Sequence, residues 1–233
     1  MTRGIVRAEA GFVHWINRHG KQRQWAIVPL PEAFVRWQLE WRATLYKALR
    51  SAEKRTQFAP PHLPVLATLN GAKAPAPINL AAKGVTLLPR EDRLQEVVDQ
   101  IEQFAARGAE PDYSTTWRER VGLVERIFAD AASFHPSALG GLEIFEGRTY
   151  RNLVRDPRAS LLFLSGGPDF VSYQIDVIAE LVRENDLRYR YLSGLRRLFE
   201  GAPFHVPQSR YGCGYVFWVI GVSDKTPRTR SWE

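Results

Sequence analysis

The chain has 233 residues, and its 45% share of hydrophobic residues excludes a disordered polypeptide, because that much apolar surface suffices for a packed core. Its single cysteine, Cys213, excludes an intramolecular disulfide and a zinc site built on cysteines. Lysine and arginine total 32 against 25 aspartate and glutamate, and the formal charge of +7 either attracts anionic partners or merely keeps the protein soluble.

The first fifty residues predict a β-hairpin followed by a helix. Two apolar segments within residues 11–30 flank a polar turn, where Gly20 can take a positive φ. Pro31 suits the first turn of a helix, and basic residues such as Arg36 and Arg42 are expected on its exposed surface. The apolar stripe of this helix is Phe34, Trp37, Trp41, Leu45 and Leu49.

Residues 62–112 predict two short strands and a second helix. The strands are expected at 63–69 and 84–88, with a loop in the Pro/Ala-rich segment between them. The helix is expected at 91–107, where apolar residues recur at helical spacing and Gly108 suits a C-terminal cap.

A third helix and several strands are predicted in the rest of the chain. Thr116 and Glu119 form a capping box, which predicts the start of the third helix. Residues 171–177 alternate between apolar and polar side chains and are the clearest strand signal. Asp186 is the expected N-cap of a further helix. Other strands are expected at 140–147, 159–165 and 214–222, and a short helix or turn at 149–156.

These elements predict an α+β protein, with a small antiparallel barrel or sheet in the C-terminal half packed with several amphipathic helices. We expect an N-terminal hairpin and helical region at 1–110 and an α+β region at 111–233, or one domain formed by both. No apolar run approaches the ~20 residues of a membrane-spanning helix, and the N-terminus lacks the pattern of a secretory signal. We therefore expect a cytoplasmic protein with no membrane contact.

The most informative stretch for function is TYRNLVRDPRASLLF, residues 149–163. It places Arg148, Thr149, Arg151 and Asn152 together just before a buried strand. Guanidinium, hydroxyl and amide groups are donors that hold a phosphate, and the turn can add backbone N–H groups. The alternative is a solvated helix that bears arginines and has no ligand.

The string T-x-R-N-L-x-x-D-P-R-A-S-L-L at residues 149–162 resembles a segment of FMN-binding split barrels, the pyridoxamine 5′-phosphate oxidase-like group that includes haem-utilisation proteins. The resemblance covers about residues 140–200 and implies a short helix followed by a barrel strand. It implies that Thr149, Arg151 and Asn152 contact the FMN phosphate, while Arg148 is added on charge grounds. It also implies a homodimer with flavin at the subunit interface, and either an oxidoreductase or a relative that binds flavin or, second to it, haem without catalysis.

A different hypothesis is a nucleic-acid-binding or complex-assembly protein without catalysis. Its support is basic residues interleaved with aromatic ones, because such surfaces combine phosphate attraction with base stacking. The candidate contacts are Arg18, Lys21 and Arg23 in the hairpin and Arg188, Arg190, Arg196 and Arg197 near the penultimate element.

Other candidate sites are weaker. The five histidines have no metal-ligand spacing, so we expect no metal site. His135 and Ser137 are expected in a turn without a nucleophile elbow, which argues against a hydrolase. Asp176 and Glu180 are expected to point to solvent rather than to form an acid/base pair.

Overall fold

The computed structural model describes residues 4–50, 61–106, 113–165, 170–200 and 208–227. The strands are β1 (Ile5–Glu9), β2 (Phe12–Ile16), β3 (Gln22–Ala26), β4 (Val65–Leu69), β5 (Ile78–Ala82), β6 (Val85–Pro89), β7 (Phe134–Glu143), β8 (Arg158–Leu164), β9 (Ser172–Val182) and β10 (Cys213–Asp224). The helices are α1 (Glu32–Arg50), α2 (Glu91–Ala106), α3 (Tyr113–Ile127), α4 (Arg148–Arg155) and α5 (Leu187–Arg197), with a single 3₁₀ turn at Ala131–Ser133.

Ten strands form two antiparallel sheets among the described residues. Strands β1, β2 and β3 form one sheet, and the other has the order β5-β4-β8-β9-β10-β7-β6. The predicted α+β class, with an antiparallel sheet and amphipathic helices, is confirmed. Because β4, β5 and β6 precede residue 110 and share this sheet with β7–β10, both halves of the chain contribute to one core. The division into regions 1–110 and 111–233 stays a prediction.

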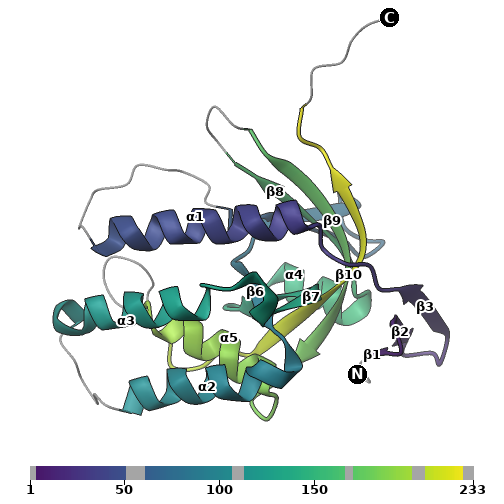
Figure 1. The fold of residues 1–233 in the computed structure, drawn as a ribbon. Helices are drawn as coiled ribbons and strands as arrows, with labels where there is room; N and C mark the ends of the chain where they lie inside the picture. The colour runs from purple at the N-terminus through teal and green to yellow at the C-terminus, as the bar shows by residue number, and fades with distance from the viewer. Residues whose placement is uncertain (1–3, 51–60, 107–112, 166–169, 201–207, 228–233) are drawn as a thin grey trace, which may run out of the picture.

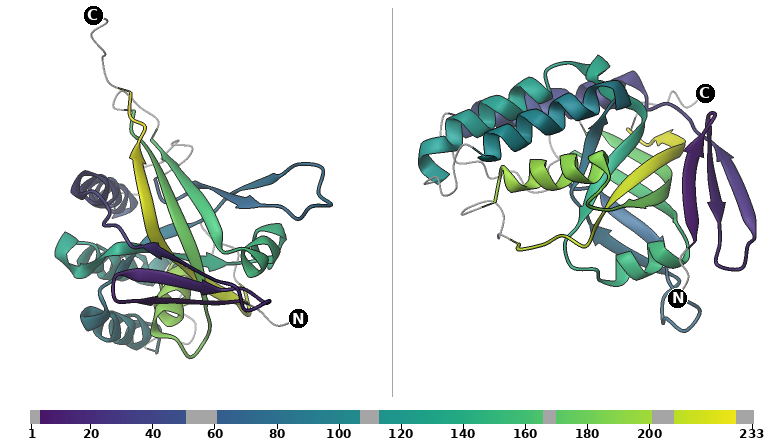
Figure 2. Two further views of the ribbon diagram at one scale, coloured as in Figure 1. Left: turned by 90° about the vertical axis from the view of Figure 1, so that its right-hand side faces the viewer. Right: turned by 90° about the horizontal axis from the view of Figure 1, so that it is seen from below.

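The helices fall into two groups around the larger sheet (Figures 1 and 2). α1, α2, α3 and α5 lie together on one side, with α2 packed on α5 and α1 on α3, whereas the small sheet of β1–β3 lies on the other side. The short helix α4 lies apart from them, against β4 and β5. No helix among the described residues is long and apolar enough to cross a membrane.

The predicted hairpin is confirmed as β2 and β3, and Gly20 in its turn has a φ of +76°. A third strand, β1, precedes it and pairs with β2, and the sequence analysis did not predict that strand. The turn between β1 and β2 contains Ala10 and Gly11, both with positive φ.

α1 follows Pro31 as predicted, but its buried face is shifted by one position from the predicted stripe. Phe34, Gln38, Arg42 and Tyr46 are buried, while Trp41 and Leu45 are only partly so. The prediction that Arg42 is exposed is therefore wrong. Its guanidinium donates to the backbone and side-chain oxygens of Gln38, at 3.1 and 2.7 Å, and lies 5.0 Å from the ring centre of Phe128. These contacts satisfy a cation in the core.

The segment between the two predicted strands was expected to be a loop, and this is wrong for its second half. Residues 78–82 form the edge strand β5, which pairs with β4 from Leu69↔Ile78 to Val65↔Ala82. Its side chains alternate between exposed and half-buried, so the apolar run typical of a central strand is missing.

The remaining elements follow the predictions closely. α2 buries Leu94, Val97, Val98 and Ile101 of the predicted apolar stripe, whereas Phe104 is only partly buried and Ala105, also expected in the stripe, is exposed. Gly108 lies outside the described residues. α3 begins at Tyr113, so the capping box at Thr116 is wrong, and the Thr116 hydroxyl instead accepts from Arg120 within the helix. Asp186 caps α5 as predicted, accepting from the Arg188 amide at 2.8 Å.

Candidate functional site

The short helix α4 and the strands next to it carry the residues for which the sequence predicts a phosphate site. α4 begins after Gly147, which supplies no side-chain cap to the first turn. It ends at Asp156, whose amide donates to the Asn152 carbonyl at 2.8 Å. Pro157 then prevents a further helical hydrogen bond, and β8 begins at the next residue.

The Asp-Pro-Arg part of the motif has a structural role. Asp156 accepts from the backbone amide of Arg158 and from its guanidinium, with contacts of 2.6–3.2 Å. Burial raises the pKa of Asp156, but these hydrogen bonds outweigh burial and hold that pKa below its usual range. The pair fixes the turn from α4 into β8, and both oxygens of the Asp156 carboxylate already accept hydrogen bonds from Arg158.

Two of the predicted phosphate contacts, Thr149 and Asn152, are buried in a polar cluster. The Thr149 hydroxyl accepts from the Asn79 side-chain amide at 3.2 Å. The Asn152 amide donates to the Thr68 hydroxyl at 3.1 Å and to the Asn70 side-chain carbonyl at 3.0 Å. The cluster thus joins α4 to both strands of the β4–β5 hairpin.

The other two predicted contacts, Arg148 and Arg151, lie on the exposed surface of α4. Within the part of the chain that the structure describes, neither side chain has a hydrogen bond or an ion pair. The structure therefore brings Thr149 and Asn152 together with Thr68 and Asn79, but it leaves the two arginines beside this cluster rather than in it.

The donors at the start of α4 fit a phosphate. Thr149 accepts one hydrogen bond, so its own hydroxyl hydrogen is available to donate. The uncapped first turn of an eight-residue helix adds backbone N–H groups with a positive helix end. Asn152 differs, because both of its amide hydrogens are already donated. Its role in such a site is to position neighbours rather than to bind.

Sequence reasoning missed Thr68, Asn70, Asn79 and Arg155 as members of this site. The Arg155 guanidinium donates to the Leu69 carbonyl and, at 3.4 Å, to the Asn152 side-chain carbonyl. Asn79 and Thr68 lie 70 and 84 positions before the α4 residues that they contact, Thr149 and Asn152. No local sequence pattern can predict contacts over such separations. The Pro/Ala-rich composition before β5 also concealed Asn79 within a predicted loop.

The residues predicted to contact nucleic acid fall into separate environments. Arg188 is paired with Glu180 and Asp186, and Arg190 is paired with Glu102. Arg196 and Arg197 have no ion pair among the described residues, but only Arg197 is exposed.

The hairpin residues Arg18, Lys21 and Arg23 are exposed on the small sheet, apart from α5 in Figure 1. The two basic groups of the prediction therefore do not join into one surface. Nucleic-acid binding stays a prediction, with the hairpin as its remaining basis.

The weaker candidates have structural roles. Asp176 accepts from Ser160 at 2.6 Å, and Glu180 binds Arg188 and the Trp218 indole, so neither carboxylate simply points to solvent as expected. His135 lies in a strand rather than a turn, and its Nδ1 accepts from the Ser137 amide. The described residues contain no group of three metal-ligating side chains.

Comparison with known proteins gives similarity to solved structures only, since no family pattern and no curated protein matches. One is HupZ from group A Streptococcus, 13% identical over 81% of this chain and 97% of that chain, with a TM-score of 0.38. Another is a putative pyridoxamine 5′-phosphate oxidase from Listeria innocua, 8% identical over 79% and 97%, with a TM-score of 0.40. A third is an FMN-binding protein from Syntrophomonas wolfei, 12% identical over 85% and 92%, with a TM-score of 0.39.

At such TM-scores the similarity is one of broad outline, and it assigns neither a ligand nor an activity to this chain.

Proposed function

We propose that this chain is an FMN-binding protein, either an oxidoreductase or a relative without catalysis, whose phosphate site lies at the start of α4. The single observation that carries the proposal is the group of unpaired donors there. The Arg148 and Arg151 guanidinium groups, the Thr149 hydroxyl and the uncapped first turn all lie within the first four residues of one helix. A phosphate dianion accepts several such charge-assisted hydrogen bonds at once.

In this proposal the buried cluster supports the binding residues. Asn79 holds the Thr149 side chain, and Asn152 ties α4 to Thr68 and Asn70, so the hydroxyl is preorganised. FMN, when bound, would supply one- or two-electron transfer. We favour FMN over haem because the cluster contains no histidine, cysteine or methionine to serve as an axial ligand.

We also propose that the protein is a homodimer, with the outer face of β5, β4 and β8 as the interface. The pairing of these strands puts every second residue of each on one face. That face carries exposed large apolar side chains, with exposed fractions of 37–66%. Apolar side chains gathered in this way are typical of a surface that another molecule covers. They are Leu69, Ile78, Leu80, Leu162 and Leu164.

The test of the cofactor is a comparison of FMN with riboflavin, which lacks the phosphate. Titration followed by flavin absorbance and fluorescence is expected to show FMN binding and much weaker riboflavin binding. Thr149→Val and Arg151→Met are each expected to weaken FMN binding roughly 10- to 100-fold, because each removes a hydrogen bond to a charged group. Arg36→Met, at an exposed position on α1, is the matched control and is expected to change nothing. Equal affinity for riboflavin and FMN, or no binding of either, would refute the proposal.

The dimer has its own test. Light scattering with size-exclusion chromatography is expected to give a dimer that Leu80→Asp dissociates, because the substitution buries an unpaired charge in the interface. Phe12→Asp is the control, since Phe12 is 40% exposed but lies on the small sheet. A wild-type monomer would refute the interface while leaving the phosphate site to the flavin titration.

A further inference from the structure

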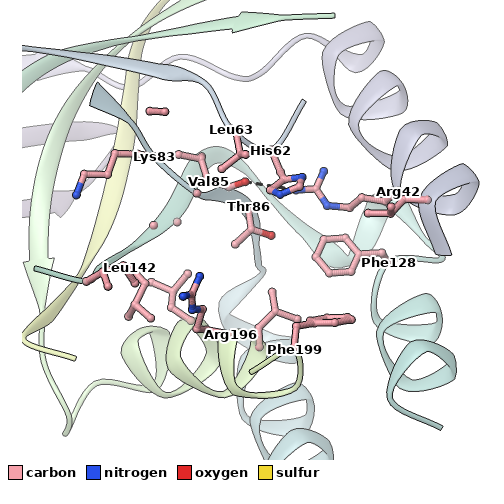
Figure 3. Close-up of a pocket in the computed structure, with 18 of the residues that line it drawn as sticks. Arg42, His62, Leu63, Lys83, Val85, Thr86, Phe128, Leu142, Arg196 and Phe199 are labelled. Atoms are coloured by element: carbon pink, nitrogen blue, oxygen red, sulfur yellow. Dashed lines mark hydrogen bonds between the residues drawn. The ribbon is translucent and has the colours of Figure 1, made fainter. Parts of the chain in front are cut away.

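A cavity of about 450 Å³ lies between α1, α5 and the sheet edge formed by β6 and β7 (Figure 3). None of Arg148, Thr149 and Arg151, which we propose to bind the FMN phosphate, lines it. Its volume is within the range of sites that hold small molecules. The cavity is therefore a second place where a ligand of moderate size fits.

Most of the wall is apolar. Helices α1 and α5 contribute lining residues from two sides, and residues 144–145, just after β7, also line the cavity. The apolar residues that line the wall include Leu45, Leu49, Leu142, Ile144, Leu195 and Phe199. A ligand that fills this space gains from burying apolar surface, so its body is expected to be hydrocarbon or aromatic.

Three cationic side chains line the cavity, and two of them are already hydrogen-bonded. Arg42 donates to Gln38 and, at 3.4 Å, to the Val85 carbonyl. The Lys83 ammonium points away from the cavity in Figure 3 and forms an ion pair with Glu143 at 2.8 Å. Glu143 neutralises Lys83, and the Arg42 guanidinium already donates to neutral oxygens, although it has no ion pair among the described residues.

Arg196 is the third cation, and its side chain extends from α5 into the cavity (Figure 3). Its Nε is buried and has no hydrogen-bond partner within the described part of the chain. Burial lowers the pKa of Arg196, while the charge of Glu200 one turn later raises it, yet no ion pair joins these two side chains. A buried guanidinium N–H group without an acceptor costs free energy, so a ligand that supplies an acceptor there is favoured.

A second unpaired donor lines the same cavity from the opposite wall. The indole Nε1 of Trp41 on α1 is buried and also has no hydrogen-bond partner among the residues described. Both Trp41 Nε1 and Arg196 Nε are donors only, so the missing group is an acceptor in each case. An anionic acceptor suits Arg196 in particular, because its guanidinium has no ion pair among the described residues even though Glu200 lies one turn later.

We propose that this cavity binds a small apolar carboxylic acid, whose carboxylate pairs with Arg196 and whose apolar body fills the space between α1 and α5. A carboxylate accepts two parallel hydrogen bonds from a guanidinium, and its remaining lone pairs suit an indole N–H. The proposal is independent of FMN, because the two sites share no residue.

The experiment uses dodecanoate as the probe, below its micelle concentration, with calorimetric titration of the full chain. We expect one dodecanoate per chain and weaker binding of dodecanol, which has the same body without the charge. Arg196→Met keeps the apolar stem and removes the charge, so it is expected to weaken dodecanoate binding about tenfold or more. Arg197→Met is the matched control, because Arg197 is the next residue of α5 and is exposed.

Further variants keep the proposal testable if Arg196→Met fails to fold. Arg196→Lys retains the charge and is expected to retain most of the affinity. Trp41→Phe removes the second donor but leaves Arg196 in place, so it is expected to cost less than Arg196→Met. Saturating FMN is expected to leave dodecanoate affinity unchanged. The proposal would be overturned if dodecanoate did not bind or bound no better than dodecanol. It would also be overturned if Arg197→Met lost as much affinity as Arg196→Met, or if dodecanoate competed with FMN.

Discussion

The ion pair between Lys83 and Glu143 provides the sharpest test of how the sheet edge is stabilised. Glu143 at the end of β7 is 1% exposed, and its carboxylate accepts from Lys83 at 2.8 Å, from the Tyr215 hydroxyl at 2.7 Å and from the Phe145 amide at 3.1 Å. Lys83→Met keeps most of the apolar stem of the side chain but removes the only cation bonded to this carboxylate among the described residues. Two neutral donors then remain for a buried charge.

The expected cost of Lys83→Met is about 2–3 kcal/mol in the free energy of unfolding at neutral pH, the range for hydrogen bonds to charged groups. The full penalty for a deeply buried pair does not apply, because the Lys83 side chain is 17% exposed and the other donors remain. For a chain of this length, the loss corresponds to a fall in melting temperature of roughly 4–12 °C.

The pH dependence identifies the mechanism. Burial raises the pKa of Glu143, but the bonds from Lys83, Tyr215 and Phe145 outweigh it, so the folded pKa lies below the usual value. The ionised carboxylate therefore stabilises the wild-type protein above the unfolded pKa of about 4.3, and this contribution is lost as the pH falls through the folded pKa. In Lys83→Met burial dominates, the pKa rises, and stability falls as the pH increases through it.

Urea unfolding monitored by tryptophan fluorescence, at several values between pH 4 and pH 8, checks both points. The difference between wild type and Lys83→Met is expected to be largest near neutral pH and to narrow toward pH 4. Lys73→Met, at an exposed lysine, is the control and is expected to stay within about 0.5 kcal/mol. A difference that is constant across this range would refute the electrostatic explanation, since loss of packing alone does not titrate.

Two further predictions concern packing and charge around α5. Gly140→Ala is expected to destabilise the fold by about 1–3 kcal/mol, because a Cβ there would lie 2.6 Å from a Leu192 methyl group. Gly84→Ala is the control and is expected to be nearly neutral, because nothing lies within 4 Å of its added Cβ. Equal melting temperatures for the two variants would contradict the tight packing at Gly140. Arg188→Met is expected to lower the free energy of unfolding in urea by about 2–3 kcal/mol, because it leaves the partly buried carboxylates of Glu180 and Asp186 without an ion pair. Arg197→Met is expected to change this free energy little. Similar losses in the two variants would contradict the importance of these ion pairs.

The elements that the sequence predicted are those whose signal is local. The alternation at residues 173–177 of β9 and the apolar stripe of α2 follow from periodicities of two and 3.6 residues, and in both segments the apolar positions are the ones that are buried. Asp186 caps α5 for an equally local reason, because its side chain needs only an amide two residues later.

The features that the sequence analysis missed depend on contacts between residues far apart in the chain. β5 is an edge strand with alternating exposure, so only its pairing with β4 identifies it. The sequence around Arg42 predicts a surface residue, because its contacts with the Val85 carbonyl and the Phe128 ring depend on residues far away in the chain. At the candidate site, the motif identified Thr149, whereas Asn79 becomes part of the site only through the fold.

The two proposed ligand sites lie on different parts of one sheet, and two short segments connect them: the turn from β5 to β6, and residues 144–147, which lead from the cavity lining into α4. β5 carries Asn79 beside α4 and leads through Lys83 and Gly84 into β6, which lines the cavity. Glu143 accepts from Lys83 and from the Phe145 amide, so both segments are anchored to β7. A coupling free energy between the sites requires an element with two arrangements, and an anchored segment offers only one. We therefore expect FMN and an apolar acid to bind independently in the wild-type protein.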